Sequence, residues 1–278
     1  MKKCSIVAKI LMVGLIGMLG VWLAGCSSDS PTDANSAQPN IYAILAIDDV
    51  DIINGWGGIG TSDVVDLTNV QQWLADIQQN TGFPTNIKIL KTSDGSMTGS
   101  ALAAAIAGVK AKVAKNDVVL FWYSGHGLAN ENPGGSKWPL MAFLDPARQA
   151  RYTAVDFNAA VIGPLKASGA KLVIAAADCC NNLLSQGKLR RLVRATSENY
   201  ATLFKQKGSL VMAGAIRGEV SYGSNAEGGQ FTAQFLKTFY ENVASTQPSW
   251  QTILTNATQV IVDPYDGSAQ HPQGELDM

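Results

Sequence analysis

Two uninterrupted apolar runs, each leading into a short polar motif, constrain this chain more than any other feature. Residues 117–127 read Asp-Val-Val-Leu-Phe-Trp-Tyr-Ser-Gly-His-Gly, and residues 171–180 read Lys-Leu-Val-Ile-Ala-Ala-Ala-Asp-Cys-Cys. Apolar runs without alternation indicate strands that are buried on both faces, as in a parallel sheet. Open α/β sheets bind ligands at the carboxyl ends of such strands, which makes His126 and Cys180 candidates for one common site.

Strand and helix signals alternate along the rest of the chain. Apolar runs predict further strands at 41–47, 86–90 and 209–215. Apolar residues at helical spacing predict helices at 63–79, 100–115, 155–166 and 230–243. Thr98 or Ser100 is the candidate N-cap of the second helix. The alternation predicts one α/β domain over residues 40–278, with a mostly parallel sheet and helices on both faces.

The first 25 residues are typical of a bacterial secretion signal. Lysines precede an apolar stretch at 10–23 that is short for a membrane-spanning helix. Leu-Ala-Gly-Cys at 23–26 then resembles the lipobox of bacterial lipoproteins, which implies a lipid on Cys26 as the new N-terminus. The alternatives are an ordinary signal peptide cut near Ala24 and an uncleaved anchor.

A polar segment at 26–39 follows, and its composition predicts a flexible tether. Signal and tether together predict a protein that is lipid-anchored in the bacterial cell envelope. Ser27 and Ser28 carry no acidic inner-membrane retention signal, so we expect the outer membrane or periplasm.

Composition argues against several classes of function. The formal charge is −1, and no block of lysine and arginine indicates a nucleic-acid site. Of four cysteines, only Cys179 and Cys180 lie beyond residue 26, and adjacent cysteines match no zinc-ligand spacing. We therefore expect no metal and no cofactor. An oxidising compartment could oxidise this pair, in which case activity would depend on a reductant.

His126 and Cys180 are suited to nucleophilic catalysis. An imidazole transfers protons near neutral pH, and a thiol beside it can be deprotonated and attack a carbonyl carbon. The N–H groups of Gly127 and Cys180 are candidate donors to the oxyanion that then forms. Strand alternation assigns Cys179 to the core and Cys180 to the cleft. The competing interpretations are a histidine bonded within its turn and a cysteine buried as a small hydrophobe.

Tyr-Ser-Gly-His-Gly, followed about fifty residues later by Asp-Cys-Cys, resembles the metacaspase-like branch of the caspase-like cysteine peptidases of clan CD. The likeness covers roughly residues 40–278 and extends through segments at 42–48, 66–74, 212–232 and 270–273. It implies a caspase-like sandwich with a mostly parallel six-stranded sheet. It also implies a cysteine endopeptidase that acts on peptide or protein substrates.

The resemblance assigns roles to individual residues. Cys180 would be the nucleophile, and His126 the general base and then the general acid. Asp178, Asp66 and Ser124 would line the S1 pocket, which holds the substrate residue before the cut bond (P1). Two carboxylates there imply cleavage after arginine or lysine. From the residues alone, Asp178 could instead cap a helix, and Asp66 could face a helix dipole.

The chain departs from the family pattern at two places. Asn181-Asn182-Leu183 follows the nucleophile where metacaspases usually have His-Ser-Gly, although asparagine tolerates the left-handed backbone that glycine would take there. Asp63 stands where the family often has a cysteine, three residues before the pocket aspartate.

Some family members need calcium and are cut between their two halves. Asp145 and Asp156 lie in a candidate acidic loop, but no spaced set of calcium ligands is visible. The basic segment at 188–194 is either a self-cleavage stretch or a solvated helix face.

Two rival functions stay open at this point. One is a non-catalytic caspase-like binding or scaffold lipoprotein. The other keeps the dyad but changes the substrate, to acyl transfer or to cleavage after aspartate.

Overall fold

The two apolar runs form neighbouring strands at the centre of the main sheet. The computed structural model describes residues 38–50, 59–130, 135–147, 152–180, 196–262 and 267–278. The runs are β3 (Val118–Ser124) and β7 (Leu172–Asp178), and every residue of both strands is buried. The strands pair in parallel, with Ser124 opposite Asp178 at their carboxyl ends.

Within the described residues the main sheet has six strands, in the order β13-β8-β7-β3-β1-β2. The other four are β1 (Ile41–Ile47), β2 (Thr85–Lys91), β8 (Gly208–Ala213) and β13 (Gln273–Asp277). All neighbours are parallel except β13, which runs antiparallel to β8 at one edge. The predicted α/β fold, with a mostly parallel six-stranded sheet, is confirmed.

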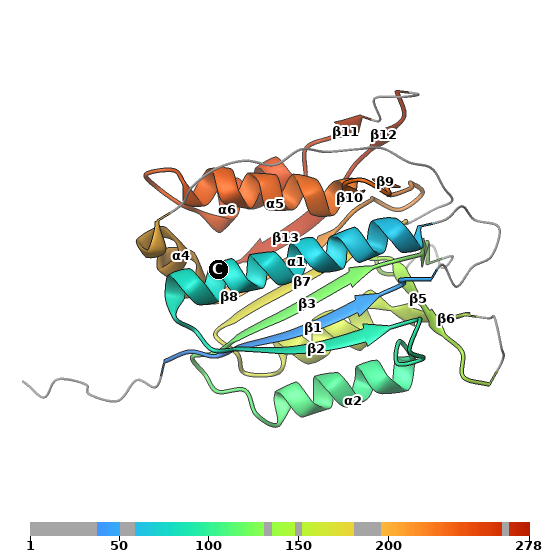
Figure 1. Cartoon of the computed structure of the whole chain (residues 1–278), viewed down its shortest axis with the longest axis horizontal. Helices are drawn as coiled ribbons and strands as arrows, with labels where there is room; N and C mark the ends of the chain where they lie inside the picture. The colour runs from blue at the N-terminus through green and yellow to red at the C-terminus, as the bar shows by residue number, and fades with distance from the viewer. Residues whose placement is uncertain (1–37, 51–58, 131–134, 148–151, 181–195, 263–266) are drawn as a thin grey trace, which may run out of the picture. The chain divides into compact units, whose positions relative to one another are not determined.

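Helices cover both faces of this sheet (Figure 1). One face carries α1 (Gly60–Thr81), α4 (Ser197–Phe204), α5 (Gln230–Val243) and α6 (Trp250–Ala257). The other carries α2 (Gly99–Lys110), the π-helical turn η1 (Asn158–Ile162) and α3 (Gly163–Lys166). Alternate residues of β3 pack into the two cores, Trp122 into the first and Tyr123 into the second. The two-residue period of a strand explains this division.

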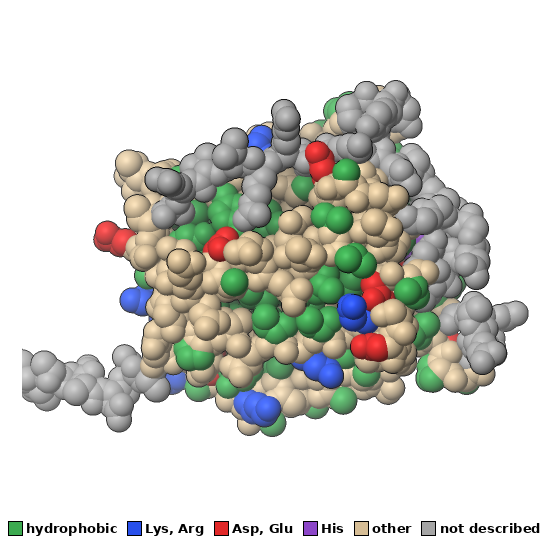
Figure 2. All heavy atoms as spheres, viewed as in Figure 1, with side chains coloured by type: hydrophobic (Ala, Val, Ile, Leu, Met, Phe, Trp, Pro, Cys, Tyr) green, Lys and Arg blue, Asp and Glu red, His purple; other side chains and the backbone are tan. Residues whose placement is uncertain are grey.

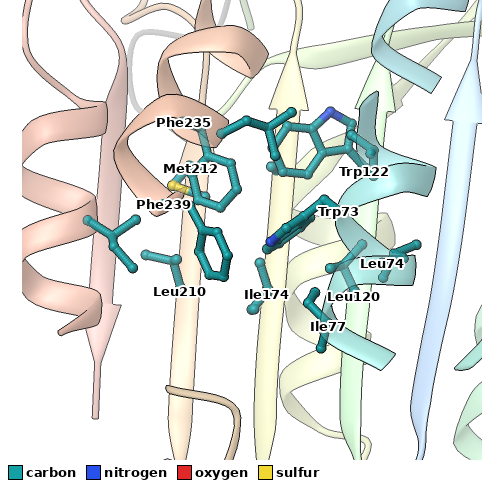
Figure 3. Close-up of a cluster of buried hydrophobic side chains, with 14 of the residues drawn as sticks. Trp73, Leu74, Ile77, Leu120, Trp122, Ile174, Leu210, Met212, Phe235 and Phe239 are labelled. Carbon is teal, nitrogen blue, oxygen red and sulfur yellow. The ribbon is translucent and has the colours of Figure 1, made fainter. Parts of the chain in front are cut away.

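Trp73 on α1 is the centre of the larger core. Its ring lies edge-on to Trp122 of β3 and to Phe235 and Phe239 of α5, with ring centroids 6.0, 5.1 and 5.3 Å away. Figure 3 shows Trp73 beside Ile174, with Phe235 and Phe239 on one side and Leu74 and Ile77 on the other. This cluster fixes α1 and α5 over the sheet, and both helices begin near its carboxyl edge (Figure 1).

Short antiparallel sheets complete the described part of the fold. β4 (Gly127–Leu128) follows β3 almost directly and pairs with β5 (Leu140–Leu144), which pairs with β6 (Tyr152–Asp156). The two-stranded sheets are β9 (Gly223–Ser224) with β10 (Gly228–Gly229), and β11 (Ile261–Val262) with β12 (Ala269–Gln270).

The structure corrects one predicted helix and adds elements that the sequence did not indicate. The helix predicted from residue 155 begins only at Asn158, because Val155 pairs with Met141 in the β5–β6 hairpin. Residues 273–277, for which the sequence predicted no element, form strand β13, because the open edge of β8 offers them backbone partners. The other predicted strands and helices are present with end shifts, and Thr98 is the N-cap of α2 through a bond from the Ala101 N–H.

Several predictions fall outside the described residues. They include the signal at 1–25, the lipidation site Cys26, most of the tether, the turn residues 181–183 and the basic segment at 188–194. The compact unit that contains the described fold spans Gln38–Met278.

Figure 2 shows few charged side chains on the face that it draws, and several basic and acidic ones lie close together toward its lower right. Val64 of α1 and Ile87 of β2 are among the large apolar residues that stay exposed, at 40% and 41%. Of the helices in the described ranges, none combines the length and the apolar character that crossing a membrane requires.

We expect Trp73→Ala to lower the free energy of unfolding by about 3–5 kcal/mol, because it removes the ring at the centre of the aromatic cluster. Val64→Ala on the same helix is the matched control, and it should change that free energy by less than about 0.5 kcal/mol because the side chain is exposed. Urea unfolding followed by tryptophan fluorescence measures both. A similar effect for the two variants would contradict the packing described for α1.

Candidate active site

The pairing of β3 with β7 brings the two sequence motifs together. Beyond the Ser124–Asp178 pair, the Gly125 N–H donates to the Asp178 carbonyl at 3.3 Å, which carries the strand pairing one residue further. His126 and Cys180 each lie two residues past that pair. His126 is buried and Cys180 is partly exposed. The carboxyl edge of the sheet therefore places a histidine and an accessible cysteine on neighbouring backbones.

Gly127 lies directly against the cysteine segment. A Cβ at this position would lie 2.6 Å from Cys179 Sγ and would also collide with the Cys180 carbonyl oxygen, so only glycine fits. The Ala142 N–H donates to the His126 carbonyl at 3.0 Å. Hydrogen-bonded and non-hydrogen-bonded pairs alternate along an antiparallel ladder, so the next pair, Gly127 and Met141, has no mutual hydrogen bonds. In such a pair the N–H is directed away from the partner strand. The Gly127 N–H is therefore directed away from β5.

Tyr123 holds the backbone of the histidine turn. Its hydroxyl donates to the His126 carbonyl at 2.6 Å and accepts from the Ala142 N–H at 3.1 Å, and its ring stacks on Phe143. Burial raises the pKa of the Tyr123 hydroxyl well above its usual range, so the hydroxyl stays protonated and keeps donating. The turn between β3 and β4 is thus fixed from the core side.

The two adjacent cysteines face different surroundings, as strand alternation predicts. Cys179 packs into the core on the face of the sheet that carries α2, η1 and α3, and burial raises the pKa of its thiol well above its usual range. Cys180 is partly exposed, and its Sγ lies 3.6 Å from the carbonyl oxygen of Ser221. Cys180 is therefore the thiol that a substrate can reach.

A cluster of buried carboxyl groups lies next to these motifs. The Ser124 hydroxyl lies 2.6 Å from Asp66 Oδ2 and 2.9 Å from Asp63 Oδ1. Asp66 Oδ1 accepts from the Gly229 N–H at 2.8 Å. Across the cluster, a Cβ on Gly229 would collide with Asp178 and would lie 2.9 Å from Asp66 Oδ2. The structure thus brings Asp66, Asp178 and Ser124 together, as expected of a pocket, and adds Asp63 to them.

Asp178 is held by a dense set of donors. Its Oδ1 accepts from the Ser221 hydroxyl at 2.6 Å, and its Oδ2 accepts from both the N–H and the hydroxyl of Thr232, at 2.8 and 2.7 Å. Gln270 supports this arrangement by donating to Ser221 Oγ and to the Gly214 carbonyl at 2.9 and 2.6 Å. These bonds fix the carboxylate at the end of β7, beside Cys180.

Burial sets the electrostatics of the cluster. It raises the pKa of Asp63 and of Asp66 well above the usual range, and neighbouring carboxylates push both pKa values in the same direction. Burial also raises the pKa of Asp178, although the bonds from Ser221 and Thr232 counteract it. A cation that entered this cluster would relieve the repulsion among the carboxylates.

Sequence reasoning did not assign roles to Asp63, Ser221, Thr232 and Gln270. Asp63 was visible as a departure from a family pattern, three residues before Asp66 and therefore on the same helix face. The other three act through hydrogen bonds between segments distant in sequence, and no local pattern signals such contacts. In the described ranges, no group of three His, Cys, Asp or Glu residues is arranged so that it could hold a metal ion.

Comparison with known proteins agrees with this geometry. The model of the caspase-domain family, peptidase C14, matches residues 63–277 and so includes both motifs and the carboxyl cluster. The chain belongs to the caspase-domain family. It therefore carries a caspase-family peptidase domain, and proteins are the substrate class that this family implies.

Two solved structures support the architecture. A protein from Geobacter sulfurreducens is 16% identical, with a TM-score of 0.53, and the match covers 86% of this chain and 93% of that one. Caspase-1 from Spodoptera frugiperda is 14% identical, with a TM-score of 0.53 over 86% of this chain and 88% of that one. At such identities the likeness concerns the fold alone. Among curated proteins, no relative matches the sequence significantly.

We expect Gly127→Ala to displace the turn after β7, because the new methyl group would collide with backbone that cannot rotate away. The free energy of unfolding should fall by about 1–3 kcal/mol, and the alkylation rate of Cys180 should change. Gly108→Ala in α2, where a Cβ meets no atom within 4 Å, is the control and should be neutral or stabilising. Urea unfolding and iodoacetamide labelling measure the two effects, and equal behaviour of both variants would contradict the close approach.

The carboxyl cluster also predicts an unusual dependence of stability on pH. Between the pKa of an unfolded aspartate, about 4, and the raised value, the folded state binds more protons. Stability should therefore fall as pH rises through the raised pKa. Asp63→Asn removes one of these groups and should stabilise the protein at pH 8 by about 1–3 kcal/mol, with a smaller gain at pH 5. Urea unfolding at both pH values tests this against Glu241→Gln on the surface of α5. A variant that loses stability equally at both pH values would overturn the prediction.

Proposed function

We propose that this chain is a cysteine endopeptidase with a His126–Cys180 dyad that cleaves after arginine or lysine, as the metacaspase-like branch does. The observation that carries the proposal is the convergence of the two strand ends, β3 and β7, beside a buried cluster of carboxyl groups. Membership of the caspase-domain family supports the reaction class, and the carboxylates support the preference for a basic side chain.

In the proposed reaction, His126 takes the proton of the Cys180 thiol, and the thiolate attacks the carbonyl carbon of the peptide bond. A C–S bond forms, and the electron pair of the carbonyl moves to its oxygen. The N–H groups of Gly127 and Cys180 stabilise the resulting oxyanion. His126 then gives its proton to the amide nitrogen as the C–N bond breaks. A water molecule, deprotonated by His126, hydrolyses the acyl thioester and restores the thiol.

The proposed specificity follows from the charge of the pocket. A guanidinium or ammonium group that enters among Asp66, Asp178 and Ser124 forms charge-assisted hydrogen bonds and neutralises carboxylates that repel one another. An acidic P1 side chain would add a further negative charge to the same volume. Basic peptides are therefore the substrates that this cluster favours, and aspartate is the residue it rejects.

The N-terminal segment supports an envelope location for this activity. The lipobox-like sequence before Cys26 and the polar tether that follows would place the peptidase domain on a lipid anchor. We include lipidation of Cys26 in the proposal, with the outer membrane or periplasm as the compartment.

One sequence feature favours a second candidate function, a non-catalytic binding or scaffold lipoprotein. Asn181-Asn182-Leu183 replaces the His-Ser-Gly that usually follows the nucleophile in metacaspases. Such a protein would keep the fold and the carboxyl pocket, and it would bind basic segments without cutting them.

The experiment is turnover of fluorogenic peptides with Arg, Lys or Asp at P1, with reductant and with or without calcium. We expect cleavage after Arg and Lys that Cys180→Ala abolishes. Cys179→Ala is the matched control: it removes the neighbouring thiol, which packs in the core, and should leave turnover within a factor of about three. Cleavage after Asp would retain the dyad and overturn the pocket. A folded protein that cleaves none of the peptides would favour the scaffold.

A further inference from the structure

The carboxyl cluster contains one oxygen that no protein group satisfies. Both oxygens of Asp66 and both oxygens of Asp178 accept hydrogen bonds from the described residues. Asp63 Oδ2 is buried and has no partner in the part of the chain that the structure describes. A buried carboxylate oxygen left without a donor is costly, so its presence calls for an explanation, and a ligand or ion that completes it is one.

The position of this oxygen links it to the proposed pocket. Asp63 lies in the first turn of α1 and is 5% exposed, and its other oxygen lies 2.9 Å from the Ser124 hydroxyl. Ser124 in turn lies 2.6 Å from Asp66. The unpaired acceptor therefore belongs to a carboxyl group inside the cluster and not to a separate site.

The same contacts require an additional proton. The Ser124 hydroxyl has one hydrogen, yet it lies within hydrogen-bond distance of two carboxyl groups, those of Asp63 and Asp66. One contact can use the hydroxyl hydrogen, and the other needs a proton on a carboxyl group. The proton fits Asp63, because Asp66 also accepts from the Gly229 N–H and that bond favours its charged form.

We propose that Asp63 is a specificity-determining residue of the pocket: it holds a proton when the pocket is empty and exchanges it for the guanidinium of a P1 arginine. The inference rests on the proposed function and deepens it. It adds a third carboxyl group to the expected Asp66 and Asp178, and it makes binding of a basic side chain release a proton to solvent. No bond other than this O–H bond breaks, and the guanidinium replaces the charge of the proton that leaves.

Geometry favours arginine over lysine in this arrangement. A guanidinium presents five N–H donors in a planar fork, whereas an ammonium presents three donors at one point. The carboxylate oxygens of Asp66 and Asp178 already accept hydrogen bonds from Gly229, Ser221 and Thr232. A ligand would therefore have to share these oxygens with donors of the protein. Asp63 Oδ2 supplies a free acceptor, and a fork can reach it while it also contacts the other two carboxylates.

The titratable groups around Asp63 come from several elements. Asp66 lies on the same helix, Asp48 follows β1, and Asp178 ends β7, and all three raise the pKa of Asp63 further. Tyr123 and Cys179 also interact with Asp63, and burial keeps both protonated. With acidic groups on several sides and no basic group among these neighbours, a proton or an incoming cation is what neutralises Asp63.

The test is calorimetric binding of a peptide that ends in arginine to the Cys180→Ala protein, in which no turnover occurs. Titration in phosphate and in Tris, whose ionisation enthalpies differ, counts the protons released on binding. The same peptide with citrulline, the neutral isostere of arginine, controls for contacts other than charge. We expect proton release with arginine and none with citrulline.

Asp63→Asn in the same background should abolish the proton release and weaken binding of the arginine peptide about ten- to hundredfold. Glu241→Gln is the matched control, since it removes an exposed carboxyl group from α5. A lysine peptide should lose less affinity than the arginine peptide. In the active protein, KM for arginine substrates should rise as pH falls, and Asp63→Asn should flatten that dependence while kcat changes little.

Each outcome separates the two proposals. Unchanged affinity and proton release in Asp63→Asn would overturn the role of Asp63 and leave the basic pocket intact. Equal binding of the arginine and citrulline peptides by the parent protein would overturn the basic pocket, and with it the proposed specificity.

Discussion

The parallel pairing of β3 with β7 is the contact on which the rest of the site depends. Its register sets Ser124 opposite Asp178, and both motifs leave the sheet from that pair. A shift of one residue would exchange the faces of every side chain in the strand and would send Cys179 instead of Cys180 to the surface. The unbroken burial of the two strands makes such a shift costly, because both faces are packed against helices. The positions of His126 and Cys180 at the ends of the strands therefore depend on core packing.

The buried carboxyl cluster lowers the stability of the fold. Asp63, Asp66 and Asp178 are buried close to one another, and the loss of hydration opposes folding at neutral pH, with repulsion from neighbouring carboxylates adding to the cost for Asp63 and Asp66. The aromatic cluster around Trp73 offsets this cost, because it fixes the helix that carries two of the three carboxyl groups. α1 therefore has a destabilising part, the acidic first turns at the carboxyl edge, and a stabilising part, the apolar stripe that packs on the sheet.

Much of this could be predicted from the sequence, and the limits have physical causes. Uninterrupted apolar runs predicted β1, β3 and β7, because a strand that is buried on both faces needs apolar side chains at nearly every position. The orientation of the adjacent cysteines followed from the two-residue period. The hairpin of β5 and β6 escaped prediction because its short strands lack a decisive period, and β13 because only the free edge of β8 gives its polar sequence a strand partner. Within the site, the roles of Ser221, Thr232 and Gln270 depend on hydrogen bonds to residues far away in the sequence. No local sequence pattern indicates such bonds.

Gln270 determines at which stage of synthesis the support of Asp178 can be complete. Its side chain bonds to Gly214 and to Ser221, which in turn holds Asp178, so the carboxylate at the end of β7 depends on a segment that the ribosome makes about ninety residues later. A nascent chain that has emerged as far as α6 would contain His126 and Cys180 and still lack the side chain that supports Ser221 and, through it, Asp178. If the chain is the exported peptidase proposed above, completion of the carboxyl cluster late in synthesis would limit premature cleavage of neighbouring proteins.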